Sequence, residues 1–130
     1  MSFTNYLETE ILDHVFGGAA YSAPGTHYLA LFTAVSDGEA GSVTEVSTSG
    51  TAYARVAVSF TTSGDTTSNS GAVEYATATG SGFGTVTHVG VYDASTSGNL
   101  MCYATLTASK AIAAGDVFRV PAGDLDITLN

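Results

Sequence analysis

Basic residues are nearly absent from this chain of 130 residues, which holds only Arg55, Lys110 and Arg119 against twelve acids, for a formal net charge of -9. Affinity for nucleic acids depends on Lys and Arg side chains that displace counterions from phosphates, so the composition argues against a nucleic-acid partner. An anionic membrane surface is disfavoured for the same reason, and no apolar run approaches the ~20 residues that cross a bilayer. We therefore expect neither a nucleic acid nor a membrane as a partner.

Cysteine and charged residues are also scarce. Cys102 is the single cysteine, which excludes an internal disulfide, and its place in the apolar run LMCYATL predicts a small core residue. Charged residues make up 12% of the chain and hydrophobic ones 45%, so Ser, Thr, Gly and Asn must form much of the surface. This composition is typical of a β-rich protein with polar turns.

The N-terminal segment MSFTNYLETEILDHVFGG lacks the basic start and unbroken apolar middle of a secretory signal, so we expect synthesis in the cytoplasm without export by a signal peptide. The segment instead carries apolar residues at helical spacing: Phe3, Leu7, Ile11, Leu12, Val15 and Phe16. Ser2 or Asn5 is expected to cap a helix over 3–16, and Gly17 with Gly18 to end it in a left-handed conformation. Its apolar face must dock on its own domain or on a neighbour.

The chain from residue 25 onward is predicted to form short strands separated by polar turns. Seven stretches have the composition or the alternation of strands: 27–33, 53–60, 72–77, 85–93, 99–106, 117–120 and 124–129. Alternation of apolar and polar residues is clearest in YARVAVSF and DLDITL. We expect one domain over 1–130, mainly β, built as an antiparallel β-sandwich of about seven strands (25–130) with one N-terminal amphipathic α-helix within 1–18.

The inward faces of these strands predict the core, which comprises Leu29, Leu31, Val56, Val58, Phe60, Val89, Val91, Leu106, Leu125, Ile127 and Leu129. Two stretches, 34–50 and 61–71, carry no strand pattern and are long for so small a domain. We expect them to be structureless binding loops. The stretch 85–106 predicts a hairpin with Gly98 and Asn99 left-handed in its turn.

The residues that suggest a nucleotide-binding or catalytic site do not stand in the sequence patterns that such sites require. Gly80, Gly82 and Gly84 precede a strand rather than a helix, so they predict a flexible turn anchored by Phe83 and not a nucleotide site. His88 lies inside a predicted strand, and the chain has no nucleophile elbow. We therefore expect a half-buried histidine bonded to a neighbouring strand or chain rather than a catalytic base.

Metal ligands are equally dispersed. His14, His27 and His88 fall in different predicted elements without a close-spaced ligand, which argues against zinc. Asp124 and Asp126 offer oxygen atoms to calcium but match no recognised calcium loop. We expect a protein that is not an enzyme, with no catalytic, cofactor-binding or metal-binding residues.

Five blocks follow one another along nearly the whole chain: SFTNYLETEILDHVFGG, YSAPGTHYLALFTA, AYARVAV, THVGVYDASTSGNL and SKAIAAGDVFRVPAGDLDITL. In their order and spacing they resemble a family of small tailed-bacteriophage virion proteins described as short tail-fibre-like. The resemblance implies a structural part of the phage particle with no catalytic residues to assign. A chain without coiled-coil heptads and without collagen-like or β-helical repeats is not expected to form a long fibre by itself.

Two functions of a virion structural protein fit these observations. The first, which we expect, is a capsid decoration or cement protein that binds the outer surface of the particle and stabilises it. The alternative is a tail-fibre, tail-tip or baseplate-associated module that contacts the host surface through loops rich in Ser, Thr, Asn and Tyr. The expected partners are accordingly the major capsid protein or tail proteins. An enzyme such as a polysaccharide depolymerase lacks its motifs here.

Docking is expected through the apolar stripe of the helix and at least one basic residue, because crowded copies of so acidic a chain repel one another within a Debye length of roughly 8 Å. The candidate docking residues are Phe3, Leu7, Ile11, Val15, Arg55, Lys110 and Arg119. The acids expected to face outward are Asp37, Glu39, Glu45 and Asp65. Self-association as a trimer is a further expectation, since closed symmetric assemblies bury such surfaces.

Overall fold

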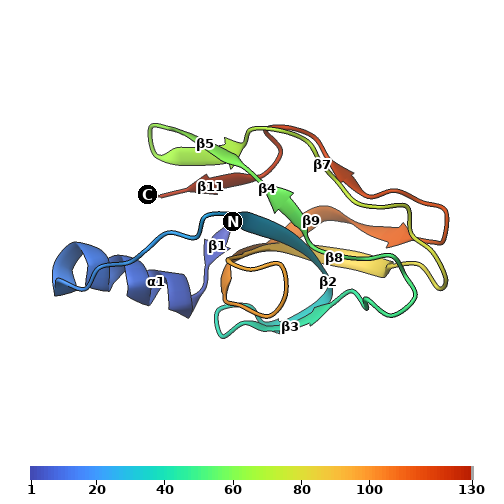
Figure 1. Cartoon of the computed structure of the whole chain (residues 1–130), viewed down its shortest axis with the longest axis horizontal. Coiled ribbons are helices and arrows are strands. Elements are labelled where there is room, and N and C mark those ends of the chain that lie inside the picture. The colour runs from blue at the N-terminus through green and yellow to red at the C-terminus, as the bar shows by residue number, and fades with distance from the viewer. Residues whose placement is uncertain (130) are drawn as a thin grey trace.

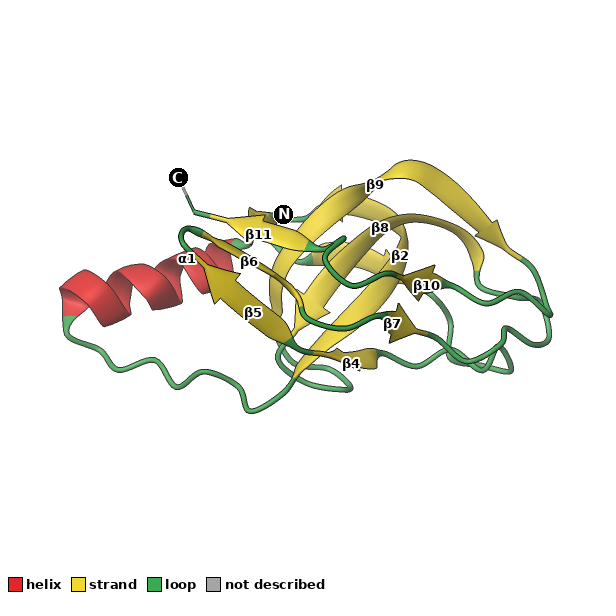
Figure 2. Cartoon of the chain, turned by 90° about the horizontal axis from the view of Figure 1, so that it is seen from above, coloured by secondary structure: helices red, strands yellow, loops and turns green. Residues whose placement is uncertain are grey.

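The computed structural model describes residues 1–129, which form one large antiparallel sheet with two small sheets across one of its faces (Figures 1 and 2). The large sheet has the order β1-β9-β8-β2-β3, and β4 pairs with β2. Its strands are β1 (Ser2–Phe3), β2 (His27–Asp37), β3 (Ser42–Glu45), β4 (Val56–Val58), β8 (Gly84–Tyr92) and β9 (Leu100–Ile112). The small sheets are β11-β6-β5 and β10-β7, formed by β5 (Phe60–Ser63), β6 (Thr66–Asn69), β7 (Val73–Glu74), β10 (Arg119–Val120) and β11 (Asp126–Thr128). The predicted mainly β, antiparallel fold with one N-terminal helix is confirmed.

The hairpin of β8 and β9 is the centre of the large sheet, as its sequence predicts. Val91 lies opposite Cys102, and Val89 opposite Ala104. In the turn, the Asp93 carboxylate accepts hydrogen bonds from the Asn99 backbone N–H (2.7 Å) and side-chain amide (2.9 Å). Gly98 is left-handed as predicted, but the residue that joins it in this conformation is Ser97 and not Asn99.

The core lies between the large sheet and the two small ones. Of the predicted core residues, those that are buried are Leu29, Leu31, Val58, Val89, Val91 and Leu125. Those that pack against the core while partly exposed are Val56, Phe60, Leu106 and Ile127. The prediction is wrong for Leu129, which is 58% exposed although its backbone N–H still donates to the Asp65 carbonyl at 2.9 Å: the last residue of the pattern lies beyond the core.

A second apolar cluster, which the sequence patterns did not predict, covers the other face of the large sheet. It is formed by Ala30, Phe32, Tyr92 and Leu100. Gly90 makes room for it, since a Cβ at this position would lie 2.6 Å from the Phe32 ring. The central strands are therefore apolar on both faces, which a one-sided alternation does not describe.

The two stretches expected to be structureless loops contain strands instead. Residues 34–50 hold the end of β2 and all of β3, which pair as a hairpin. Residues 61–71 hold most of β5 and all of β6, and β6 also pairs with β11. Their Ser and Thr side chains give no apolar alternation, so the backbone pairing left no signal in the hydropathy pattern.

The N-terminal helix begins later than predicted. Phe3 lies in β1 opposite Cys102, and the cap of α1 (Asn5–Leu12) is Thr4 rather than Ser2 or Asn5. The Thr4 hydroxyl donates to the Leu100 carbonyl (2.6 Å) and accepts from the Leu7 N–H (3.4 Å). This buried residue both caps the helix and fixes its first turn to β9.

The far end of the helix is formed by one wider turn, η1 (Asp13–Gly17). Gly18 follows with a φ of +75°, which confirms the predicted left-handed end. The chain then returns to β2 through an extended segment, so that the helix lies at one end of the molecule (Figure 1).

Candidate docking surfaces

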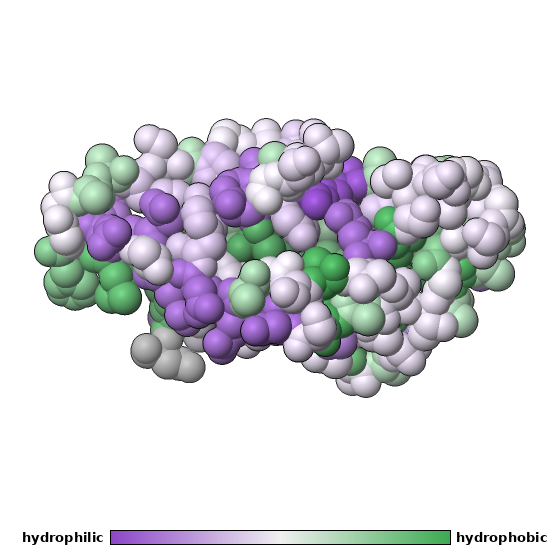
Figure 3. Space-filling view, turned by 90° about the horizontal axis from the view of Figure 1, so that it is seen from below, coloured by the Kyte–Doolittle hydropathy of each residue, from purple (hydrophilic) through white to green (hydrophobic). Residues whose placement is uncertain are grey.

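The end of the helix carries an exposed apolar cluster, which we call the helix tip: Leu12, Val15 and Phe16. Their exposed fractions are 57%, 60% and 82%, whereas Leu7 in the first turn is buried at 8%. Ile11 lies between these extremes. Figure 3 shows hydrophobic residues gathered at the end of the molecule where the helix lies. The predicted stripe is therefore divided, with its start packed on the sheet and its end free for a partner.

The helix that ends in the helix tip is acidic. Glu8, Glu10 and Asp13 lie on the same helical segment, which contains no Lys or Arg. His14 is engaged through its Nδ1, which accepts a hydrogen bond from the Tyr21 backbone N–H at 3.1 Å. A partner for this surface must offer an apolar recess, and positive charge beside it would favour binding.

Arg55, one of the predicted docking residues, is enclosed within the protein instead. Its guanidinium donates to both Glu45 carboxylate oxygens at 2.9 Å and to the Ala94 (3.0 Å) and Ser97 (2.7 Å) carbonyls. It also lies 3.5 Å from the centroid of the Tyr92 ring. Only 7% of the side chain is exposed, so Arg55 holds β3, the 93–99 turn and β8 together rather than facing a partner.

Glu45 corrects a second expectation, because this acid does not face outward as a free charge. Its side chain is 26% exposed and pairs with Arg55. The Tyr53 hydroxyl donates to it at 2.7 Å and accepts from the Leu31 N–H at 3.0 Å. Burial and the hydrogen bond to Glu45 raise the pKa of Tyr53, which keeps the hydroxyl protonated as a donor.

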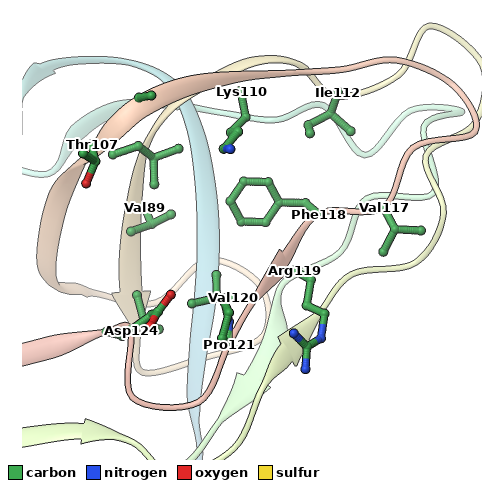
Figure 4. Close-up of a pocket in the computed structure, with 13 residues that line it drawn as sticks. Val89, Thr107, Lys110, Ile112, Val117, Phe118, Arg119, Val120, Pro121 and Asp124 are labelled. Carbon is green, nitrogen blue, oxygen red and sulfur yellow. The ribbon is translucent and has the colours of Figure 1, made fainter.

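The other two basic residues, Lys110 and Arg119, lie together on one recess between β9 and β10, drawn in Figure 4. We call this recess, of about 530 Å³, the β9–β10 groove. Its apolar lining includes Leu106, Val117 and Phe118. The Arg119 side chain is 52% exposed, and its nearest acid is Glu74 at 3.7 Å, a surface pair that contributes little.

The strand pairing explains why Lys110 points into the groove. Lys110 lies opposite Val86 in the β8–β9 ladder, and residues directly opposite share a face of the sheet. Val86 is fully buried in the core. β1 pairs with β9 only at Cys102 and Tyr103, so the second half of β9 is an open edge beside the groove.

The family model for podophage GP4 fiber I protein gp80 matches residues 2–128. The chain belongs to this family. It is thus a phage virion structural protein of the tail-fibre type, as the resemblance of its sequence blocks implied. No curated protein matches the chain. The matched range includes both the helix tip and the β9–β10 groove.

The histidine and the glycines that the sequence analysis considered as possible catalytic or nucleotide-binding residues lie in a strand and in a turn of this fibre-family chain. His88 is half-buried as predicted, but its Nδ1 lies 2.7 Å from the hydroxyl of its chain neighbour Thr87 rather than bonding another strand. Gly80, Gly82 and Gly84 all have positive φ in the predicted turn, whose anchor Phe83 is buried.

Cys102 is buried as predicted, and burial raises the pKa of its thiol to about 12. The thiol is therefore protonated at neutral pH and a poor nucleophile. Within residues 1–129, no group of three or more His, Cys, Asp or Glu side chains is placed to hold a metal ion. No helix in the described range is long and apolar enough to cross a membrane.

Proposed function

We propose that this protein is a non-enzymatic module of the fibre assembly of a podophage particle, and that it attaches there through its helix tip. The observation that carries the proposal is the exposure of Leu12, Val15 and Phe16 at the end of a helix whose first turn is fixed to the sheet. An apolar cluster of this kind on a family of virion proteins is best explained by a protein partner. The description of the family favours the fibre over the capsid surface.

The number of copies in purified particles separates this function from capsid decoration, which the sequence analysis favoured. Decoration across an icosahedral shell requires hundreds of copies per particle, whereas a fibre or tail module requires a few to a few tens. Quantitative mass spectrometry against the major capsid protein measures this number directly. A count in the hundreds would replace the fibre assignment with decoration.

Attachment itself is tested with particles that lack the chain. The purified wild type should bind them, and Phe16→Ser should not. Leu129→Ser is the matched control, because Leu129 is an exposed apolar residue at 58% outside the helix tip. Equal binding by all three proteins would reject the helix tip as the attachment site.

The dependence of attachment on salt concentration distinguishes apolar contact from ionic contact as its main cause. A dock formed mainly by apolar contact should persist in about 1 M sodium chloride, where exposed charge pairs are strongly screened. Release at modest salt would show that attachment is chiefly ionic.

The absence of catalysis is part of the proposal. It is supported by the buried, protonated thiol of Cys102 and by His88, whose described hydrogen bond is to the hydroxyl of its chain neighbour Thr87, with no carboxylate among the described residues bonded to the ring to complete a triad. A turnover assay on envelope polysaccharide of the host checks it, with no product expected. Reproducible cleavage that depends on a side chain of this protein would overturn it.

A further inference from the structure

We propose that the helix tip of one copy docks into the β9–β10 groove of a second copy, so that copies of this chain join head to tail. The inference rests on the proposed function for the helix tip as a docking site: the helix tip of the first copy docks on the particle, and that of each further copy docks on the copy before it. The two surfaces are complementary in charge and in shape, and they lie far apart on one copy.

Charge complementarity selects the groove. The chain has three basic residues, of which Arg55 is enclosed by its ion pair with Glu45. The other two, Lys110 and Arg119, are exposed and both line the groove together with one acid, Asp124, so the lining keeps one positive charge in excess. On a chain of net charge -9, the groove is thus where an acidic element of a second copy meets positive charge rather than repulsion.

The helix supplies the matching charge and apolar surface. Its acids are Glu8, Glu10 and Asp13, with no Lys or Arg on the same segment. The groove is lined by Leu106, Val117, Phe118, Val120 and Leu125, and Val117 is 46% exposed. With about 530 Å³ of space, the groove gives an aromatic anchor such as Phe16 an apolar recess, with Lys110 beside Phe118 and Arg119 at its margin.

The two surfaces are far apart on one copy. Thr4 fixes the start of α1 to Leu100 and Met101 at the beginning of β9, whereas Lys110 lies near its end. At 3.3 Å per residue, these points on β9 are roughly 30 Å apart. Figure 2 shows α1 extending from one end of the molecule while β10 lies in the other half. The helix tip therefore meets the groove of another copy.

A contact between two different surfaces is heterologous. It closes into a ring if the rotation between copies is suitable, and otherwise continues as an open filament. The trimer expected from the sequence is one such ring. In a ring every copy uses both its helix tip and its groove, whereas in an open row the first copy keeps its helix tip for the particle.

Association of the purified chain is measured by sedimentation over a concentration series. Phe16→Ser should weaken it at least about tenfold, as expected for loss of an interface anchor. Lys110→Ser with Arg119→Ser should also weaken it. Leu129→Ser controls for loss of an exposed apolar residue, and Thr48→Glu with Ser49→Glu makes the same change in net charge on an exposed loop outside the groove. Both controls should associate like the wild type.

Complementation decides between a head-to-tail contact and a contact between two helix tips. The Phe16→Ser chain keeps an intact groove, and the Lys110→Ser, Arg119→Ser chain keeps an intact helix tip. An equimolar mixture should form a one-to-one complex although neither chain associates alone. A mixture that does not form this complex, or a wild type that stays monomeric at high concentration, would overturn the proposal. Loss of particle attachment by Phe16→Ser would still support the proposed function in that case, so the two failures are distinguishable.

Discussion

In an isolated domain a charged side chain is usually exposed and an aromatic one buried, but Arg55 and Phe16 show the reverse. The charged Arg55 side chain is 7% exposed, and the aromatic Phe16 is 82% exposed. Arg55 can be buried because Glu45, two backbone carbonyls and the Tyr92 ring face its guanidinium. Within residues 1–129, Phe16 has no such partners.

The contrast separates two parts of the molecule with different roles. Around Arg55, polar groups are satisfied inside the chain, and within residues 1–129 no buried side-chain nitrogen or oxygen atom lacks a hydrogen-bond partner. At the helix tip, apolar area stays in water, which costs about 25 cal/mol for each Å² left exposed. The polar groups of the β-sheet body are thus satisfied within residues 1–129, whereas the helix tip is the part that we propose is covered by a second protein chain.

Disruption of the core should have the largest effect. Val91→Asp places a carboxylate at a site that is 2% exposed, between β2 and β9, where no basic partner lies opposite it. We expect no folded protein, because an unpaired buried charge costs more than a small domain can tolerate. Circular dichroism and solubility measure the outcome. Thr85→Asp, at an exposed site on the same strand, is the control and should fold.

Removal of the buried cation should have the next largest effect. Arg55→Met leaves the Glu45 carboxylate without its partner, and we expect the free energy of unfolding to fall by about 3 kcal/mol. Adding Glu45→Gln should recover part of this loss, because the remaining side chain is neutral. Urea denaturation measures both variants. If Arg55→Met alone were as stable as the wild type, the contacts of Arg55 would not stabilise the β-sheet body.

Loosening the attachment of the helix should have a smaller effect. Thr4→Val removes the hydroxyl that caps α1 and donates to Leu100, and we expect a loss of about 1 kcal/mol. Thr9→Val, on an exposed position of the same helix, is the matched control for a β-branched residue. If the two variants lose equal stability, Thr4 does not act as the anchor of the helix.

Change at the helix tip should have the smallest effect on stability. Phe16→Ser removes a side chain that is 82% exposed, so the free energy of unfolding, measured by urea denaturation, should change by no more than the roughly 0.5 kcal/mol that surface substitutions usually cause. The same variant is expected to lose association. A large loss of stability would instead place Phe16 in the fold and remove the distinction between the body and the helix tip.

The sequence predicts those parts of the fold that depend on local pattern. The β8–β9 hairpin follows from alternation around Val89 and Val91 and from the turn residue Gly98, and Gly18 marks the end of the helix. The β6 strand escaped prediction because its Ser, Thr and Asn side chains give no apolar alternation, and β3 because it is short and Val43 is its single apolar residue. The pairing of β6 with β11, which is distant in sequence, leaves no signal in the local pattern.

The candidate docking surfaces could be predicted only in part for the same reason. Helical spacing identifies Val15 as apolar surface on a helix, but spacing does not show that the sheet covers Leu7 and leaves Val15 free. From the sequence alone, Arg55, Lys110 and Arg119 are equally good candidates for docking, because they are the three basic residues of the chain. Only the fold places Glu45 against the first and brings the other two to one groove.

The most direct test of this account is a cross-link between the helix tip and the groove. One chain carries Phe16→Cys and another Val117→Cys, and the mixture is treated with a short thiol cross-linker. Native Cys102 does not interfere, because it is buried and burial raises the pKa of its thiol to about 12. The account predicts rapid formation of a covalent dimer that contains one chain of each kind. Absence of this dimer, or a product formed only between two Phe16→Cys chains, would contradict it.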